Sequence, residues 1–145
     1  MQGLHLTADL RGCAVARPLM TEPAALRSIC LDAVAAAGLR PVGELFHRFA
    51  PPAGTDASDA TAPAGITGVV LLAESHLAVH TWPELEAATL DVYVCNLGAD
   101  NSARAESLLA ALIAAFAPSA VERHALERGA AAAASAGAAS ASAPR

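Results

Sequence analysis

The chain has 145 residues and a formal net charge of −5, from 9 basic and 14 acidic residues. A chain of this length fits one domain, which can bury roughly two thirds of the surface that its unfolded form exposes. Lys and Arg form no cluster, so the charge pattern excludes a basic surface for nucleic acid. Every apolar run is shorter than the roughly 20 residues that cross a bilayer, and no membrane span is expected.

Cysteine and histidine usage narrows the class of protein further. The chain has an odd number of cysteines, namely Cys13, Cys30 and Cys95. Its first residues do not show the basic start and following apolar run of a secretory leader. We therefore expect reduced thiols in a cytoplasmic protein without a secretory leader. The histidines and cysteines contain no CxxC, HExxH or similar ligand spacing, so we expect no metal site.

In chain order, the first expected element is a strand over residues 3–10, where apolar and polar side chains alternate. A helix is expected next, with Thr21 as its N-cap, Pro23 in its first turn and Gly38 as its stop. Residues 39–49 predict a second strand. The apolar stripe of the helix comprises Leu26, Ile29, Cys30, Val34 and Ala37.

Residues 51–65 interrupt this pattern with a stretch rich in Pro, Gly, Ser and Asp. Such a composition is typical of an exposed, flexible loop. Shortening the loop to a few residues is expected to cost little stability, because closure free energy changes by only about 0.6 kcal/mol per doubling of loop length. A shortened chain that fails to fold would show that the loop packs against the domain.

Three apolar strands follow at short spacing, over residues 66–73, 76–82 and 87–95, and favour an antiparallel meander. Residues 102–116 predict a second helix, and residues 120–127 predict a last strand. The Ala/Ser-rich tail, residues 130–145, has nothing large to bury and is expected to be disordered. For residues 1–129 this order predicts an α+β fold, a two-layer sandwich with an antiparallel sheet and both helices on one face.

The segment AESHLAVHTWPE, residues 73–84, puts an acid, a hydroxyl and two histidines on an otherwise apolar strand. This pattern indicates polar chemistry carried by a strand. If the last two strands of the meander form a hairpin, opposite residues have numbers that sum to about 170, and Ser75 faces Cys95. Taken singly, Cys95 would be a small core residue and Ser75 a turn residue.

The segment resembles the bacterial S-adenosylmethionine decarboxylase proenzyme, a pyruvoyl-dependent enzyme of the prokaryotic single-domain type. The combination ESH…HTWPE…C is far more specific than any of its parts, and the resemblance covers residues 3–129. The matching residues are Glu74-Ser75-His76-Leu77, His80-Thr81-Trp82-Pro83-Glu84, Cys95, His5-Leu6, Asp9-Leu10, Cys13, Phe46-His47-Arg48-Phe49, Gly68-Val69-Val70 and Glu127-Arg128-Gly129.

The resemblance implies that the chain cuts itself between Glu74 and Ser75, giving residues 1–74 and 75–145. Ser75 would attack the Glu74 carbonyl to form an ester, and elimination followed by hydrolysis would leave a pyruvoyl group at residue 75. We expect a tight, strained turn there, because this shift is uphill for an unstrained amide. The ketone would replace pyridoxal phosphate, form a Schiff base with the substrate amine and accept the electrons left by carbon dioxide.

The resemblance also implies roles for five other residues. His80 would accept a proton during self-processing, with Thr67 in support. Cys95 would donate a proton in catalysis, since a thiol with a reference pKa of about 8.5 is mostly protonated at neutral pH. Glu84 would bind the ribose hydroxyls of S-adenosylmethionine, and Phe49 would stack on its adenine. The product would be the aminopropyl donor for spermidine synthesis.

The geometry of a β-strand limits whether His80 and Thr67 can reach Ser75 within one chain. Ser75 and His80 are an odd number of residues apart, so on one regular strand they point to opposite faces. Thr67 lies far along the preceding strand from Ser75. Both facts agree with a homodimer in which His80 and Thr67 serve the partner's site at a twofold interface, and the family is dimeric.

Several alternatives stay open at this point. His80 could be a core histidine bonded to a backbone carbonyl, Glu84 a turn carboxylate and Phe49 a core aromatic. A serine hydrolase using Ser75, His80 and Asp91 lacks the GxSxG elbow. The other functional alternatives are a pyruvoyl decarboxylase of arginine or ornithine and an unprocessed, non-catalytic homologue.

The chain departs from the family's pattern in four ways. Thr67 stands where the family usually has serine, which keeps the hydroxyl but crowds it. The loop over residues 51–65 is longer than the family's turn, and the Ala-rich tail is extra. The first strand also offers no second aromatic ring to sandwich an adenine with Phe49.

Overall fold

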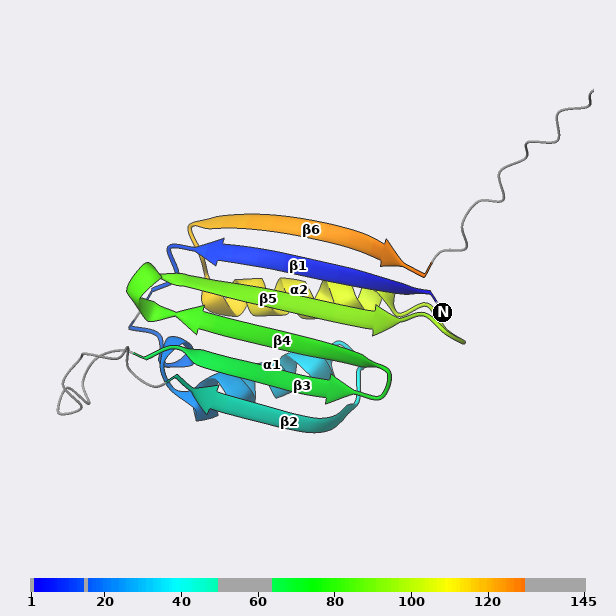
Figure 1. Cartoon of the computed structure of the whole chain (residues 1–145), viewed down its shortest axis with the longest axis horizontal. Coiled ribbons are helices and arrows are strands. Elements are labelled where there is room, and N and C mark those ends of the chain that lie inside the picture. Colours follow the sequence, from blue (N-terminus) through cyan, green and yellow to red (C-terminus); the bar gives the residue numbers. More distant parts are fainter. Residues whose placement is uncertain (1, 15, 50–63, 130–145) are drawn as a thin grey trace, which may run out of the picture.

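The computed structural model describes residues 2–14, 16–49 and 64–129. Within them the chain forms strands and helices in the predicted order (Figure 1). The predicted loop lies outside the described residues over 50–63, and so does the predicted tail. The elements are β1 (Gly3–Arg11), η1 (Pro18–Met20), α1 (Pro23–Ala36), β2 (Pro41–Arg48), β3 (Ile66–Leu72), β4 (Ser75–Trp82), η2 (Pro83–Leu85), β5 (Ala87–Cys95), α2 (Ser102–Phe116) and β6 (Ala120–Arg128).

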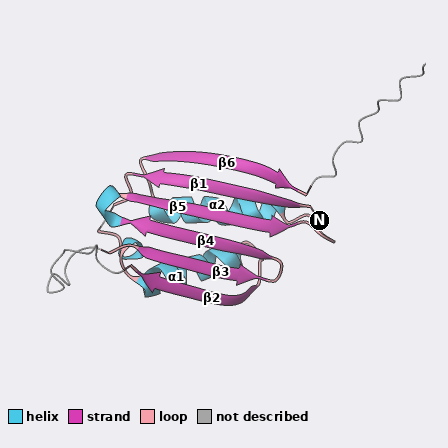
Figure 2. Cartoon of the chain, viewed as in Figure 1, coloured by secondary structure: helices cyan, strands magenta, loops and turns pink. Residues whose placement is uncertain are grey.

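The strands form one sheet in the order β2-β3-β4-β5-β1-β6, and every neighbouring pair is antiparallel. Both helices cover the same face, so the molecule has two layers (Figures 1 and 2). The predicted α+β sandwich is therefore confirmed. We call the sheet face without helices the open face.

The core lies between the sheet and the two helices. Along β1, Leu6, Ala8 and Leu10 are buried toward the helices, whereas the intervening side chains lie on the open face. From α2, Leu108 and Phe116 pack into the same cluster. Burying a side chain of this size contributes about 1.5–3 kcal/mol, so the helix face supplies most of the driving force for folding.

Helix α1 begins and ends for different reasons. Its N-cap is Glu22, which makes no capping hydrogen bond through its side chain, so the prediction of Thr21 as N-cap was wrong. Pro23, with its fixed φ, opens the first turn instead. At the other end Gly38 has a φ of +71°, and the Leu39 N–H reaches back to the Val34 carbonyl. Gly38 thus stops the helix as predicted, in a Schellman arrangement.

Gly65, placed in the predicted loop, is instead a packed residue. Its backbone carbonyl accepts a hydrogen bond from the Phe49 N–H at 2.8 Å, which continues the β2–β3 ladder. A Cβ atom built on Gly65 would lie 2.0 Å from the Thr81 carbonyl oxygen and 3.1 Å from the Phe49 ring. The prediction of an exposed loop is therefore wrong at Gly65.

We predict that Gly65→Ala lowers the free energy of unfolding by about 1–3 kcal/mol, the usual penalty for overpacking a core site. The Thr81 carbonyl belongs to the backbone of β4 and cannot turn aside as a flexible side chain would. Gly43→Ala is the matched control, because its Cβ would meet only a Leu71 methyl group at 3.6 Å. Urea denaturation of both variants checks the prediction, and equal stabilities would contradict it.

Candidate active site

The predicted cleavage site lies in a tight turn between two strands. Leu72 at the end of β3 pairs with Ser75 at the start of β4, so only Ala73 and Glu74 connect the strands. This agrees with the predicted turn. Among the non-glycine residues of the described chain, only Glu86 and Ala117 have a positive φ angle. Glu74 therefore does not have the left-handed backbone conformation that would indicate the expected strain.

Ser75 and Cys95 meet, although the register is one residue away from the predicted one. His76 pairs with Tyr93, so Ser75 lies level with Val94 instead of Cys95. The contact is made by the backbone, because the Cys95 N–H donates a hydrogen bond to Ser75 Oγ at 3.0 Å. The Ser75 hydroxyl is thereby held at the end of β5.

A hollow of about 310 Å³ opens beside this contact. It lies between the β3–β4 turn, the end of β5 and the chain that follows α1. Cys95 is buried, with 8% of its surface exposed, and is one of the residues that line the hollow. The hollow is lined by Gly38, Leu39, Arg40, Leu72, Ala73, Glu74, Ser75, Cys95, Leu97, Asn101 and Arg104.

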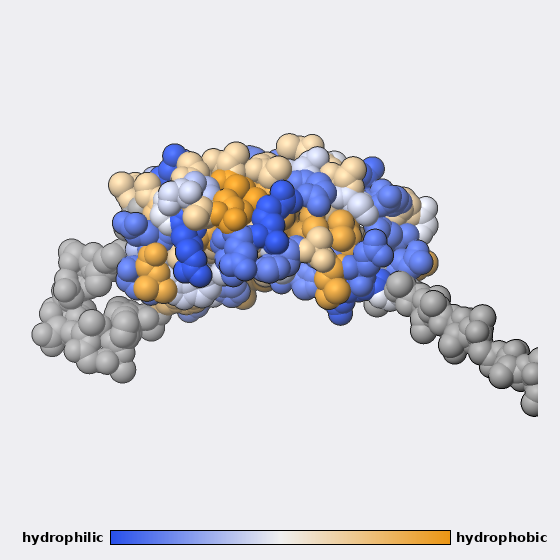
Figure 3. All heavy atoms as spheres, turned by 90° about the horizontal axis from the view of Figure 1, so that it is seen from above, coloured by the Kyte–Doolittle hydropathy of each residue, from blue (hydrophilic) through white to orange (hydrophobic). Residues whose placement is uncertain are grey.

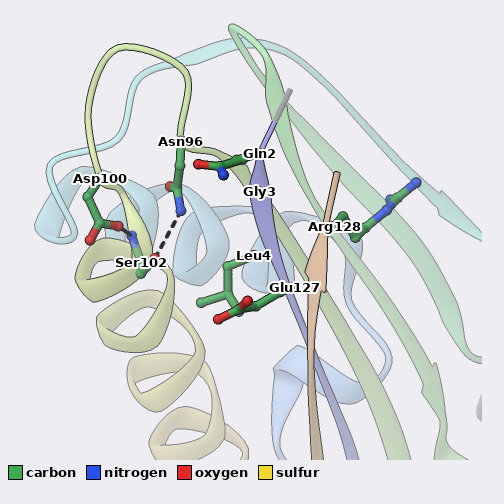
Figure 4. Close-up of a pocket in the computed structure, with 8 residues that line it drawn as sticks. All are labelled: Gln2, Gly3, Leu4, Asn96, Asp100, Ser102, Glu127 and Arg128. Carbon is green, nitrogen blue, oxygen red and sulfur yellow. Dashed lines mark hydrogen bonds between the residues drawn. The ribbon is translucent and has the colours of Figure 1, made fainter. Parts of the chain in front are cut away.

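A larger hollow, about 500 Å³, lies at the same end of the sheet, on the other side of the β5–α2 loop (Figure 4). It contains neither Ser75 nor Cys95. Asn96 donates a hydrogen bond to Ser102 Oγ across it, and hydrogen bonds from Ser102 keep the pKa of Asp100 below its ordinary value. In Figure 4 the Arg128 side chain points away from the other labelled side chains. The smaller hollow, by contrast, is lined by both Ser75 and Cys95.

His80 and Thr67 also meet, but on the open face. They are direct neighbours across the β3–β4 ladder, and Thr67 Oγ1 lies 3.1 Å from His80 Nδ1, where either can donate according to the imidazole tautomer. The His80 ring lies beside Trp82, with centroids 5.8 Å apart. In β4 the Ser75 side chain shares its face with buried Leu77, whereas His80 lies on the opposite face, as its odd spacing predicts.

Phe49 and Glu84 lie at the end of the sheet far from Ser75. Phe49 continues β2 beside Gly65, and Glu84 lies in η2, two residues after the end of β4. Since a strand rises about 3.3 Å per residue, Glu84 lies more than roughly 20 Å along the sheet from Ser75. The predicted site residues therefore form two groups: the cleavage-end group (Glu74, Ser75 and Cys95) and the far-end group (Phe49, Thr67, His80 and Glu84).

Comparison with known proteins identifies the family. The family model described as S-adenosylmethionine decarboxylase matches residues 4–129, which cover the whole sheet and both helices. The chain belongs to the S-adenosylmethionine decarboxylase family. Among its curated relatives, the S-adenosylmethionine decarboxylase proenzyme of Archaeoglobus fulgidus is 32% identical over 88% of this chain and 97% of its own length. The proenzyme of Aquifex aeolicus is 34% identical over 88% of this chain and 81% of its own length.

A solved structure agrees with this assignment. The crystal structure of the adenosylmethionine decarboxylase from Aquifex aeolicus matches with a TM-score of 0.73 at 31% identity, covering 90% of this chain and 92% of that one. The relatives named here are thus S-adenosylmethionine decarboxylases, not decarboxylases of arginine or ornithine. The family membership extends over both the cleavage-end and the far-end group.

The decarboxylase fold also assembles a polar cluster that the sequence did not predict. On the open face His5 Nε2 lies 2.8 Å from Asp91 Oδ1, and His76 Nε2 lies 3.4 Å from the same oxygen. Because Asp91 pairs with these histidines, the triad of a serine hydrolase is not assembled. The sequence did not predict this cluster because it depends on β1 pairing with β5, and the pattern of a strand does not indicate which strand lies next to it.

Two further cysteines of this decarboxylase-family chain, Cys13 and Cys30, lie in the hydrophobic core. Burial raises the pKa of Cys30 to about 12 and also raises that of Cys13, which favours the neutral thiol at both positions. All three cysteines are free. Within the described residues, no group of His, Cys, Asp and Glu is arranged to hold a metal ion, and no helix is long and apolar enough to span a bilayer.

Proposed function

We propose that Ser75 is the source of the pyruvoyl group with which this member of the S-adenosylmethionine decarboxylase family removes the carboxyl group of S-adenosylmethionine. The observation that carries the proposal is the hydrogen bond from the Cys95 N–H to Ser75 Oγ, directly after a two-residue turn. It joins the residue to be cleaved to the residue that would supply the catalytic proton.

Self-cleavage would use only protein groups and water. Ser75 Oγ attacks the carbonyl carbon of Glu74, the Glu74–Ser75 C–N bond breaks, and an ester links the two residues. Loss of the Ser75 α-proton then expels the Glu74 carboxylate. Water replaces the nitrogen of the resulting dehydroalanine, and ammonia leaves. His80 is the proton acceptor for the elimination, and the Thr67 hydroxyl at 3.1 Å orients its imidazole.

The residues around position 75 fit a pyruvoyl group. The group keeps the carbon atoms of Ser75, puts a ketone oxygen in place of the amide nitrogen and loses Oγ, so it needs no more space than serine. When present, it supplies the ketone that takes up electrons as carbon dioxide leaves. Cys95, which lines the same hollow, would donate the proton to the substrate carbon through its thiol. Neither pyridoxal phosphate nor a metal ion is needed.

The separation of the two groups of residues supports a homodimer with two equivalent sites. One chain cannot bring the far-end group to Ser75, because that group lies at the other end of the sheet. Two chains related by a twofold axis, with their open faces together, can set the far-end group of one against the cleavage-end group of the other. Exposed Leu45 and Leu71 on the open face provide apolar contact area.

Within such a composite site, Glu84 and Phe49 bind the nucleoside of the substrate. The Glu84 carboxylate is exposed and can accept two hydrogen bonds from the ribose hydroxyls. The half-buried Phe49 ring offers a flat surface to the adenine and a favourable partner to the sulfonium charge. The free cysteines suit a reducing compartment, and we place the protein in the cytoplasm.

An intact-mass spectrum tests the proposal. The purified protein should give two fragments, residues 1–74 and 75–145, whose summed mass equals that of the uncut chain plus one water and minus one ammonia. The cleaved protein should release carbon dioxide from carboxyl-labelled S-adenosylmethionine and not from arginine or ornithine. A folded protein that stays in one piece would instead support a non-catalytic homologue.

A further inference from the structure

Strand β6 is an exposed edge of the sheet. In the described part of the chain only β1 pairs with it, and all nine of its residues are exposed (Figure 1). Figure 3 looks onto this edge and shows hydrophilic and hydrophobic side chains interspersed along it. Such an edge carries a row of unpaired N–H and C=O groups, which can template the pairing of another strand. Charged side chains usually discourage that pairing, so their order along β6 matters.

The ladder determines which backbone groups of β6 are free. The Asn96 N–H donates to the Gln2 carbonyl at 2.8 Å, so even-numbered residues of β1 bond toward β5. Alternate residues of an antiparallel strand bond to its two neighbours, so odd-numbered residues of β1 bond toward β6, where their partners are even-numbered. The residues of β6 whose N–H and C=O point to the free edge are therefore Val121, Arg123, Ala125 and Glu127.

The charges of β6 are complementary to their own copy in one antiparallel register. With Ala125 opposite Ala125 of a second copy, Arg123 lies opposite Glu127, and Glu122 lies opposite Arg128. Each pair occurs twice because of the twofold axis. The backbone agrees with this register, since Arg123, Ala125 and Glu127 all point to the free edge.

Neighbouring registers lose this match. Centring the pairing on Arg123 or on Glu127 sets like charges directly opposite each other, which is destabilising. Centring it on His124 or Leu126 leaves none of the Glu and Arg side chains of β6 opposite an opposite charge. The order of charges thus selects one register and rejects its neighbours.

Both arginines are already held in place by their own chain. Arg123 Nη2 contacts Glu106 Oε2 of α2 at 2.5 Å, and the Arg128 guanidinium lies over the Tyr93 ring at 5.0 Å from its centroid. A guanidinium has five N–H donors, so these contacts leave donors for a second carboxylate. Glu122 lies 3.4 Å from His124 of the same strand and would exchange this contact for Arg128 of the second copy.

We propose that β6 is an interface at which two copies of this chain join edge to edge, centred on Ala125. About six backbone hydrogen bonds would form between the two strands. The Glu and Arg pairs on both faces fix the register, and Leu126, 60% exposed in one chain, lies opposite His124 of the second copy. The two sheets become one continuous sheet. This interface is separate from the open face and does not depend on the proposed enzyme activity.

Charge exchange tests the proposal. Arg123→Glu sets two glutamates opposite each other at both symmetric positions, and Glu127→Arg sets two arginines there. Each single variant should weaken edge association by roughly tenfold or more. The double variant Arg123→Glu/Glu127→Arg should restore it, and so should an equimolar mixture of the two single variants. Within one strand residues 123 and 127 are about 13 Å apart, so rescue cannot come from contact inside one chain.

A backbone variant provides a second readout. Ala125→Pro removes an N–H that points to the free edge and is not used by the β1 ladder, so this chain should fold but fail to associate. Leu126→Pro removes a ladder donor to β1 and should destabilise the fold itself. Sedimentation velocity should give the single variants and Ala125→Pro half the mass of the wild-type assembly. A wild-type mass that none of these variants changes, or a double variant that does not regain association, would overturn the proposal.

Discussion

Ser75→Ala chains are expected to remain in one piece and to have no measurable decarboxylase activity. The methyl group of alanine cannot attack the Glu74 carbonyl and cannot be eliminated, so no ketone forms. The fold should survive, because the variant loses only the hydrogen bond that Ser75 Oγ accepts from the Cys95 N–H, about 1 kcal/mol. A denaturing gel and an intact-mass spectrum check cleavage, and thermal unfolding checks the fold.

Ser107→Ala is the matched control, because Ser107 is an exposed serine on α2 far along the chain from the turn. It should cleave at the wild-type rate. A Ser75→Ala chain that still yields the two fragments would refute the assignment of Ser75 as the nucleophile. So would wild-type protein that is folded and yet shows only the full-length band after long incubation.

Cys95→Ala is expected to separate the two reactions. The variant keeps the backbone N–H that holds Ser75 Oγ, so it should still cleave itself. It loses the thiol, and a missing general acid typically lowers turnover by about 10²–10⁴-fold. Without the thiol, nothing protonates the substrate carbon after carbon dioxide has left. A proton that adds to the cofactor carbon instead would aminate the pyruvoyl group. This inactivation appears as a mass change on the fragment that starts at residue 75.

His80→Ala should fail at the other step. Without its proton acceptor the chain is expected to stall as the ester between Glu74 and Ser75. Hydroxylamine cleaves esters more readily than amides, so it should split the stalled chain at that bond. A Cys95→Ala chain that cannot cleave, or a His80→Ala chain that cleaves at the wild-type rate, would contradict this division of roles.

Mixed dimers test from which chain His80 acts. Combining uncleaved Ser75→Ala chains with His80→Ala chains sets one intact Ser75 opposite one intact His80 in each heterodimer. Partial processing of the His80→Ala chains is the expected result. If native mass spectrometry confirms heterodimers and no processing follows, His80 serves the Ser75 of its own chain.

Local patterns predicted the elements well. Alternation in residues 3–10 and the helical stripe ending at Gly38 depend on neighbours in sequence, and the structure has a strand and a helix there. The N-cap was misassigned because Thr21 has the preferred chemistry, whereas Pro23 decides where the helix starts. Propensity alone does not choose between two adjacent signals.

Long-range pairing was less accessible to prediction. The meander register was wrong by one residue, because the η2 turn, whose length decides the register, has no distinctive sequence signal. The cluster of His5, His76 and Asp91 was missed because it requires β1 to pair with β5, which is far along the chain. By contrast, the opposite faces of Ser75 and His80 follow from strand parity alone and were predicted.

The strand order has a consequence for the protein after cleavage at residue 74. The first fragment would contain β1, β2 and β3, and the second would contain β4, β5 and β6. In the sheet β1 lies between β5 and β6, so a strand of the first fragment is threaded between two strands of the second. The fragments can part only by breaking three separate ladders, β3–β4, β5–β1 and β1–β6. The two fragments would therefore stay associated after cleavage, because neither contains a contiguous set of strands that forms the sheet without the other.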